Sequence, residues 1–237
     1  MPRKRGYRKP RGGYRRRKTN YRRRRYRRKY RKKMTGMGTP SGMPLTRIAK
    51  LRYCLETGFT STNGTFLLHQ FSANDCHDPD FTSVGHQPMG WDQWKALYNH
   101  YVVVGSKMTI YGKAADTNTK SLTCGVFLDD DYTSSYSNIS GMIEARKGSF
   151  TKIGLPSGGA VMKKLTCGFS AKKYFNVANI KDNFLRLGAN TGVSPAETAS
   201  YNFWYQTEDQ STTASIRAIV IIDYVVLFSE PKSIAQS

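Results

Sequence analysis

The sequence predicts an all-β protein with two packed antiparallel sheets, preceded by a long basic N-terminal segment. Three observations support this prediction. About eight short runs rich in Val, Ile, Thr, Tyr and Phe fit pleated strands, long polar loops separate them, and helical periodicity is rare. Beyond the first 33 residues about 204 residues remain, which is enough for one well-packed domain.

Charge divides the chain at Lys33. Of the 38 Lys and Arg residues, 20 lie between Arg3 and Lys33, and the first carboxylate of the whole chain is Glu56. The remaining 18 bases are nearly balanced by 16 acids, so the net charge of +22 comes almost entirely from residues 1–33. Such a dense block of like charge, without apolar residues to build a core, is expected to be disordered when free and to bind a polyanion.

Tyrosines are interspersed among the arginines and lysines of this basic segment. Arginine grips phosphate with two hydrogen bonds, and tyrosine offers a ring face on which an unpaired base stacks, so the pairing favours single-stranded nucleic acid. Binding of this kind weakens steeply with salt. The predicted nucleic-acid-binding residues are Arg3, Lys4, Arg5, Arg8, Lys9, Arg11, Arg15, Arg16, Arg17, Lys18, Arg22, Arg23, Arg24, Arg25, Arg27, Arg28, Lys29, Arg31, Lys32 and Lys33, with Tyr14, Tyr21, Tyr26 and Tyr30.

Two other interpretations of the basic segment remain open. A nuclear-import signal is compatible with nucleic-acid binding. A basic amphipathic helix on a membrane surface is disfavoured, because the aliphatic face that it needs is missing.

Residues 34–44 are rich in Gly, Pro and Met without charge and are predicted to be a linker, which places the folded domain at 45–237. Lys50 to Thr57 alternates as a half-buried strand: Leu51, Tyr53, Leu55 and Thr57 share one face, and Lys50, Arg52, Cys54 and Glu56 share the other. Asn63-Gly64 before the apolar run Thr65 to Phe71 is typical of a hairpin turn.

Residues 72–90 form a polar loop, in which Asp75, Cys76, His77, Asp78, Asp80 and His86 raise the possibility of a metal site. Adjacent Cys and His chelate one ion poorly, and no second ligand pair follows, so a polar surface loop is favoured. Aromatic residues at helical spacing then predict a helix over Trp91 to Tyr101, followed by a strand over Val102 to Tyr111.

Ser121 to Leu128 is predicted to be a strand that ends in Asp129, Asp130 and Asp131. These acids could hold a divalent cation, but neighbouring residues of a strand point to opposite faces, so solvated turn formers are favoured. Residues 132–162 are expected to be a long connection with a helical turn near Met142 to Ala145.

The last third of the chain contains four further β-like segments. The final one is apolar at nearly every position, as expected of a strand buried on both faces. The segments are Lys163 to Tyr174, a short alternation at Asn183 to Leu187, Tyr201 to Gln206, and Ile216 to Phe228.

Nothing in the sequence requires catalysis or a cofactor. The motifs of a nucleophile elbow, a phosphate-binding glycine loop, an HExxH metal site and a nucleic-acid deaminase are missing. The four widely spaced cysteines, Cys54, Cys76, Cys124 and Cys167, are expected to be buried free thiols in a reducing compartment. No secretory signal opens the chain, and its most apolar run is too short for a membrane span, so we expect a soluble intracellular protein without membrane insertion.

The order of these segments resembles the capsid proteins of circoviruses and related circular single-stranded DNA viruses. The resemblance rests on short motifs and covers most of the chain. After the basic Arg/Tyr tail, these motifs are Trp91-Asp92-Gln93-Trp94 with Tyr98-Asn99-His100-Tyr101 leading into Val104 to Met108, Val126-Phe127-Leu128-Asp129-Asp130, Lys172-Lys173-Tyr174-Phe175, and the closing Ile216 to Phe228.

The resemblance implies a single eight-stranded jelly roll that assembles with about 60 copies of itself into a T=1 icosahedral shell. It implies that the shell packages a circular single-stranded DNA genome, that the basic tail binds host nuclear import receptors, and that the virion meets an unidentified host cell receptor. Tails of about 20 charges in about 60 copies would neutralise on the order of 1,200 phosphates.

Two alternatives from other classes remain. A cellular nucleic-acid-binding protein of ribosomal or chromatin type would carry the same basic extension on a β domain and would form no closed particle. A metal-dependent nuclease would use Asp129 to Asp131 with Asp75 or Asp78.

Overall fold

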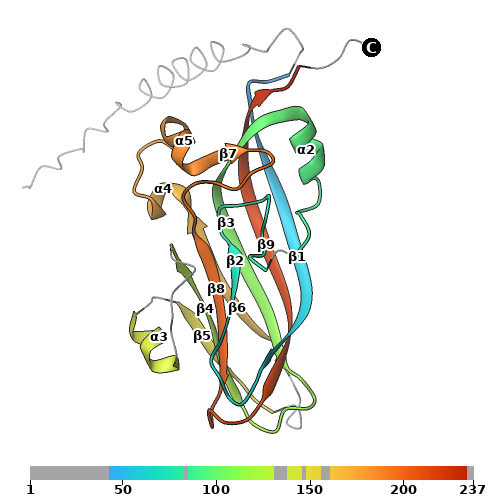
Figure 1. Cartoon of the computed structure of the whole chain (residues 1–237), viewed down its shortest axis with the longest axis vertical. Coiled ribbons are helices and arrows are strands. Elements are labelled where there is room, and N and C mark those ends of the chain that lie inside the picture. Colours follow the sequence, from blue (N-terminus) through green and yellow to red (C-terminus); the bar gives the residue numbers. More distant parts are fainter. Residues whose placement is uncertain (1–42, 83–84, 131–137, 146–147, 156–160, 234–237) are drawn as a thin grey trace, which may run out of the picture.

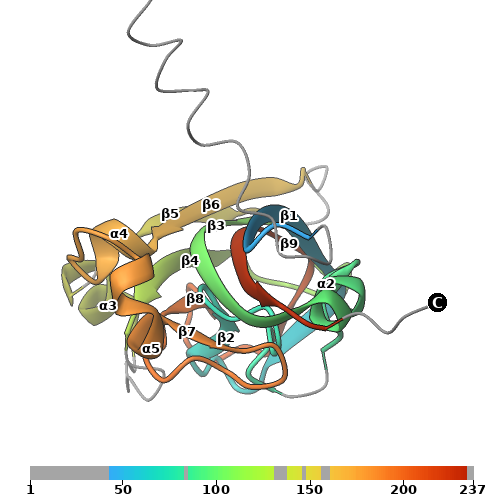
Figure 2. The ribbon, with the colours of Figure 1, turned by 90° about the horizontal axis from the view of Figure 1, so that it is seen from above.

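Two antiparallel sheets pack face to face, and their strands run along the long axis of the molecule (Figures 1 and 2). The computed structural model describes residues 43–82, 85–130, 138–145, 148–155 and 161–233. The first sheet has the order β1 (Thr46–Ser61), β9 (Ala214–Pro231), β3 (Tyr98–Ala114) and β6 (Lys163–Ser170), and the short β7 (Gly188–Asn190) also pairs with β3. The second sheet has the order β2 (Leu67–Ser72), β8 (Ser200–Thr207), β4 (Leu122–Asp129) and β5 (Ser149–Ile153).

The strand order is that of a jelly roll. The chain passes from one sheet to the other between β1 and β2, between β2 and β3, and between β3 and β4, and it returns the same way through β8 and β9. As a result the first and last strands, β1 and β9, lie side by side along their full length. This confirms the prediction of an eight-stranded all-β jelly roll with two antiparallel sheets, to which β7 adds a short extra strand.

The alternation predicted for the first strand is confirmed. In β1 Leu51 and Tyr53 are buried, whereas Lys50, Arg52 and Cys54 are exposed on the opposite face. The hairpin predicted at Asn63-Gly64 is wrong, although both residues adopt the left-handed conformation of a tight turn, with φ of 53° and 67°. β1 pairs with β9 and β2 pairs with β8, so this turn carries the chain between the sheets instead of closing a ladder.

The helix predicted over Trp91 to Tyr101 is shorter than expected. Helix α2 (Trp91–Leu97) ends before Tyr98, which begins β3 and pairs with β9 opposite Pro231. The pairing with β9 therefore overrides the helical pattern after Leu97. The aromatic spacing still has a role, because the Trp94 ring stacks on Phe228 at a centroid distance of 5.1 Å.

One local prediction in the second half is wrong, and two are incomplete. The connection over 132–162 contains β5 as well as the expected helical turn, which is α3 (Ile139–Ala145). The alternation at Asn183 to Leu187 is helical, in η2 (Lys181–Asn183) and α5 (Phe184–Leu187). The strand predicted over Lys163 to Tyr174 ends at Ser170 and continues as the one-turn helix α4 (Ala171–Tyr174).

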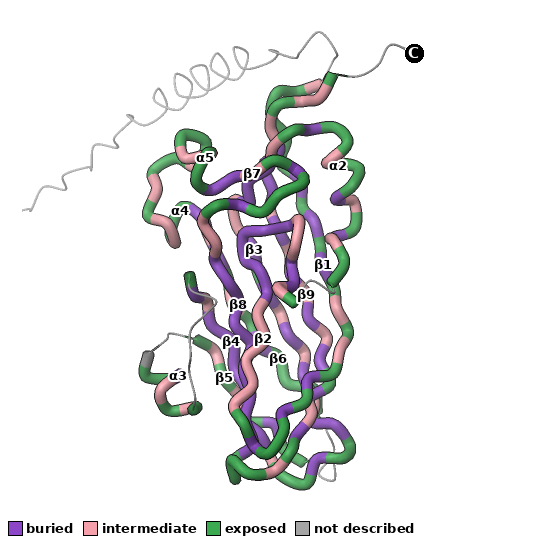
Figure 3. The backbone as a smooth tube through the Cα atoms, in the orientation of Figure 1, coloured by how far each residue is buried: buried purple, intermediate pink, exposed green. Residues whose placement is uncertain are grey.

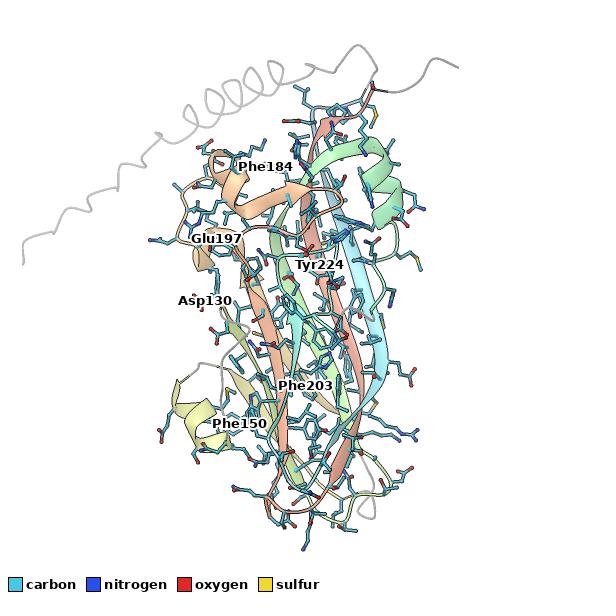
Figure 4. All side chains as sticks on the ribbon, in the orientation of Figure 1. Asp130, Phe150, Phe184, Glu197, Phe203 and Tyr224 are labelled. Carbon is cyan, nitrogen blue, oxygen red and sulfur yellow. The ribbon has the colours of Figure 1, made fainter. Side chains whose placement is uncertain are left out.

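The core lies between the two sheets, where Phe203 of β8 and Tyr224 of β9 both point (Figure 4). Buried and partly exposed residues alternate along β9, so this central strand is buried on one face only, and the prediction of burial on both faces is wrong. Figure 3 shows the alternation along the strands of the sandwich. Each fully buried large apolar side chain contributes about 1.5–3 kcal/mol to folding, so the two sheets hold each other in place.

Candidate nucleic-acid interface

All the nucleic-acid-binding residues predicted from the sequence lie in 1–33, outside the described residues. The structure describes where this segment joins the domain. The Tyr98 hydroxyl donates a hydrogen bond to the Pro44 carbonyl oxygen at 3.1 Å, and the Glu230 amide donates to the Leu45 carbonyl oxygen at 3.2 Å. The N-terminal segment is therefore joined to β1, an edge strand of the first sheet.

The outer face of the first sheet, which points away from the core, carries a cluster of basic side chains that sequence reasoning missed. We call it the basic face. Its acidic residues in the described strands are Glu56 and Asp223, and Asp223 accepts a hydrogen bond from Arg52 Nε at 2.6 Å. The six basic residues of this face are Lys50 and Arg52 of β1, Lys107 and Lys113 of β3, Lys164 of β6 and Arg217 of β9.

The strand register brings five of these residues into two groups, with Lys164 between them. Arg52 and Lys107 both lie opposite Asp223, from the strands on either side of β9. Farther along the same strands, Lys113 lies opposite Arg217. Because side chains on one face of a strand recur about every 6.6 Å, Lys107 and Lys113 stand about 20 Å apart, at the two ends of the face.

Each group borders an open groove. A groove of about 640 Å³ is lined by Lys50, Arg52, Lys107 and Asp223, and one of about 410 Å³ is lined by Lys113, Arg217 and Glu56. The surface beside Lys107 is open, since a Cβ at Gly168, which lies opposite Lys107, would meet no atom within 4 Å. Cations around a hollow of this kind can approach a phosphate backbone closely.

A partly exposed strip separates the two groups. Ile221 lies opposite Cys54 on one side and Thr109 on the other, and the Lys164 ammonium lies 5.6 Å from the centroid of the Tyr111 ring. A cation beside an aromatic ring is the pair that contacts phosphate and base together in sequence-independent binding of single strands.

The outer face of the second sheet has a different character. Trp204 of β8 and Phe127 of β4 are buried there beneath Met142 of α3. Phe150 of β5 lies beside this helix (Figure 4) and is 56% exposed. The charged outward residues of the four described strands are Asp129 and Lys152, and Lys152 forms an ion pair with Glu208. The described strands of this face therefore present few outward charges.

The acidic loop after β2 has a structural role. Asp75 accepts hydrogen bonds from the Tyr101 hydroxyl at 2.5 Å and from the His77 amide at 2.7 Å. Asp80 accepts from His69 Nε2 at 3.1 Å and from both the amide and the hydroxyl of Thr82. Within the described ranges, no three His, Cys, Asp or Glu side chains gather closely enough to hold a metal ion. These contacts show a polar loop, but Asp75, Cys76 and Asp80 are buried, so the prediction that the loop lies on the surface is wrong for this part of it.

Burial of Asp80 alone would raise the pKa of its carboxyl. The hydrogen bonds from His69 and Thr82 outweigh this effect and hold the pKa below its usual value. Asp80 therefore stays ionised near neutral pH and ties the loop to β2.

The acids at the end of β4 diverge, as expected for neighbours on a strand. Asp129 is buried and accepts a hydrogen bond from the Asp130 amide, whereas Asp130 itself is exposed. Asp131 lies outside the described residues. The two described acids therefore do not converge on one cation, as a nuclease site would require.

All four cysteines are free thiols. Cys76 and Cys124 are buried, and burial raises the pKa of the Cys124 thiol to about 12. The prediction of burial is wrong for Cys54, which is exposed in the middle of the basic face, because its β1 position alternates with the core residues Tyr53 and Leu55. In the described part of the chain, no helix has the length and apolar character to cross a membrane.

Fold and surface together define a jelly-roll domain with one basic outer face and one whose described strands present few outward charges. The solved structure of Cocksfoot mottle virus has this fold, with a TM-score of 0.50 and 14% sequence identity over 84% of this chain and 90% of that chain. Mud crab tombus-like virus is similar at a TM-score of 0.47, with 11% identity over 84% and 96% of the two chains. The decameric BFDV capsid protein is similar at 0.42, with 12% identity over 77% and 98%.

Identities this low show the fold alone. No protein-family model and no curated protein sequence matches the chain.

Proposed function

We propose that this chain is a viral capsid protein that assembles into a closed icosahedral shell and packages nucleic acid through its basic N-terminal segment. The observation that carries this proposal is the joining of two parts in one chain. A jelly-roll domain, with long loops between its strands, follows a segment with 20 bases and no acid. The positive charges of the basic segment repel one another, and phosphate groups relieve this repulsion when they bind. A closed shell would hold the basic segments of many subunits and the nucleic acid in one volume.

The finer proposal is a T=1 shell of about 60 copies around circular single-stranded DNA, as in circoviruses. It is supported by the order of short motifs from Trp91 to Phe228 and by the match between on the order of 1,200 tail charges and a genome of one or a few kilobases. The chain would then reside in the virion, enter the host nucleus during assembly through import receptors that bind residues 1–33, and meet a host cell receptor with its outer loops.

The proposal assigns a separate role to each of three segments of the chain. Residues 1–33 bind nucleic acid, residues 34–44 link this segment to the folded domain, and residues 45–237 form the shell. The nearly balanced charge of the shell region, 18 bases against 16 acids, limits repulsion between neighbouring subunits during assembly.

The test is to dissociate particles of the full chain, reassemble the subunits with equal amounts of a circular single-stranded DNA and an RNA of the same length, isolate the fastest-sedimenting fraction, and treat its extracted nucleic acid with selective nucleases. We expect particles of about 60 chains whose nucleic acid is degraded by DNase and by single-strand-specific nuclease, and resists exonuclease because it is circular. RNA in closed particles would retain the capsid proposal and refute the DNA genome. A small stoichiometric complex without particles would favour the cellular nucleic-acid-binding protein.

A further inference from the structure

The basic face concentrates charge that the domain as a whole lacks. In the described strands it carries six bases and two acids, a net +4, whereas the outward residues of the second sheet carry one base and one acid. Solvation alone explains isolated charges but not the gathering of six bases on one outer face. A polyanion that meets only the first sheet explains it.

The shape of the basic face suits an extended chain. Its grooves lie at the two ends of the face, about 20 Å apart, and between them run Ile221, Tyr111 and Cys54. Asp223 pairs with Arg52, and Lys107 lies opposite Asp223 on the other side. The carboxylate thus holds Arg52 in place, and with Lys107 on the other side the local charge stays positive.

The described chain enters the domain at the sheet that carries the basic face. It joins the domain at the start of β1, the edge strand that supplies Lys50 and Arg52 to the basic face. A nucleic acid held by residues 1–33 is therefore tethered to the sheet that carries the basic face, which raises its effective concentration there.

We propose that the basic face is a second nucleic-acid-binding surface, that it lines the interior of the shell, and that the second sheet with α3 faces outward. This inference rests on the proposed capsid function. The ligand is the phosphate backbone of the packaged strand, bound without sequence preference by the lysines and arginines at the two grooves, with a base against Tyr111. Its net +4 is about one fifth of the charge of the tail, so the face orders the outer layer of the genome and the tail supplies most of the neutralisation.

Cys54 gives a direct test, because it is exposed on the basic face and the other thiols are partly or fully buried. Closed particles of the full chain are treated with a maleimide that carries a polymer too large to enter the shell. We expect Cys54 to be unreactive in closed particles and reactive after dissociation. Reaction of Cys54 in closed particles at the rate of dissociated subunits would overturn the proposal.

A second readout separates the shell interior from a contact between subunits. A small photoreactive maleimide is placed on Cys54, the particles are irradiated, and the adducts are separated. We expect Cys54 to crosslink to nucleic acid. Crosslinks to protein alone would overturn the proposal. The matched probe is Phe150→Cys in a Cys54→Ser chain, which places the same reagent on the outer face of the second sheet, where we expect no nucleic-acid crosslink.

Matched lysine variants test the charge itself. Lys107→Ala, Lys113→Ala and Lys164→Ala together remove three lysines of the basic face, and Lys172→Ala, Lys173→Ala and Lys181→Ala remove three exposed lysines at the α4 end. For dissociated full-length subunits binding a single-stranded oligonucleotide, we expect the first set to reduce the slope of log affinity against log salt by about 2, and the second set to leave it unchanged. Equal slopes for both sets would contradict the inference. Failure to form any closed particle would instead count against the proposed function.

Discussion

The Tyr101 hydroxyl lies 2.5 Å from Asp75 Oδ1, and both residues are buried at the end of the sandwich where β3, the loop after β2 and the loop after β7 meet. The same hydroxyl also lies 3.1 Å from the Val193 carbonyl oxygen. Burial raises the pKa of Tyr101, and the neighbouring Asp75 carboxylate raises it further, so the tyrosine remains a neutral donor. One side chain therefore fastens two long loops to a central strand.

Tyr101→Phe should destabilise the subunit by about 1.5–3 kcal/mol, because a buried carboxylate loses a hydrogen-bond donor. The measurement is the free energy of unfolding of dissociated subunits in urea. Tyr111→Phe is the control, since Tyr111 is partly exposed on the basic face, and it should change stability by less than about 0.5 kcal/mol. Equal effects of the two substitutions would mean that the Tyr101 contact does not hold the loops.

Gly125→Ala should destabilise the second sheet by about 1–3 kcal/mol, because the new Cβ would lie 2.5 Å from Cζ2 of the buried Trp204 ring. Thermal unfolding followed by tryptophan fluorescence measures both the stability and the displacement of that ring. Gly168→Ala makes the same change on β6 where no atom lies within 4 Å, and it should be neutral or stabilise by about 0.4–1 kcal/mol. A stable Gly125→Ala protein with an unchanged spectrum would refute this packing.

Asp80 should make the subunit sensitive to acid. Its pKa is lowered in the folded state, so its contribution to stability is present above the unfolded-state pKa of about 3.9 and is lost as pH falls through the folded-state value. Asp80→Asn should therefore lower the melting temperature at neutral pH and flatten its fall below about pH 4. Asp116→Asn, in an exposed loop, should follow the wild-type curve. A wild-type-like slope for Asp80→Asn would show that other carboxylates govern the acid response.

Local sequence patterns were sufficient to predict a strand when the alternation of its own residues separates a buried face from an exposed face. The alternation of Lys50 to Thr57 identified the buried and exposed faces of β1, because one side of the strand must enter the core. β5 was missed because its Ser149–Ile153 segment is short, follows a Ser/Gly/Asn-rich stretch and leaves Phe150 exposed, so no apolar run marks it. The α5 segment was misread because four residues fit a period of two as well as one helical turn.

The basic face could not be predicted from local patterns, because its residues belong to four strands. Arg52 and Asp223 are 171 positions apart in sequence, and only the pairing of β1 with β9 brings them together. The sequence does show that Lys50, Arg52 and Arg217 each lie between two apolar neighbours, which is typical of outward-facing positions on a strand. The register between strands decides that the outward bases share one surface. The basic N-terminal segment could be predicted without knowledge of strand register, because its charged residues are contiguous in the sequence.

The measurement that tests the account most directly is electron microscopy of the full chain beside a chain lacking residues 1–33, with nucleic-acid content determined on the same particle fractions. The full chain should form closed, uniform particles that contain nucleic acid. The shortened chain should keep a folded β domain by circular dichroism and lose most of the packaged nucleic acid, because 20 of the 38 bases are gone. Unfolding of the shortened chain, or a full chain that stays monomeric with nucleic acid at low salt, would contradict the division into a shell domain and a packaging tail.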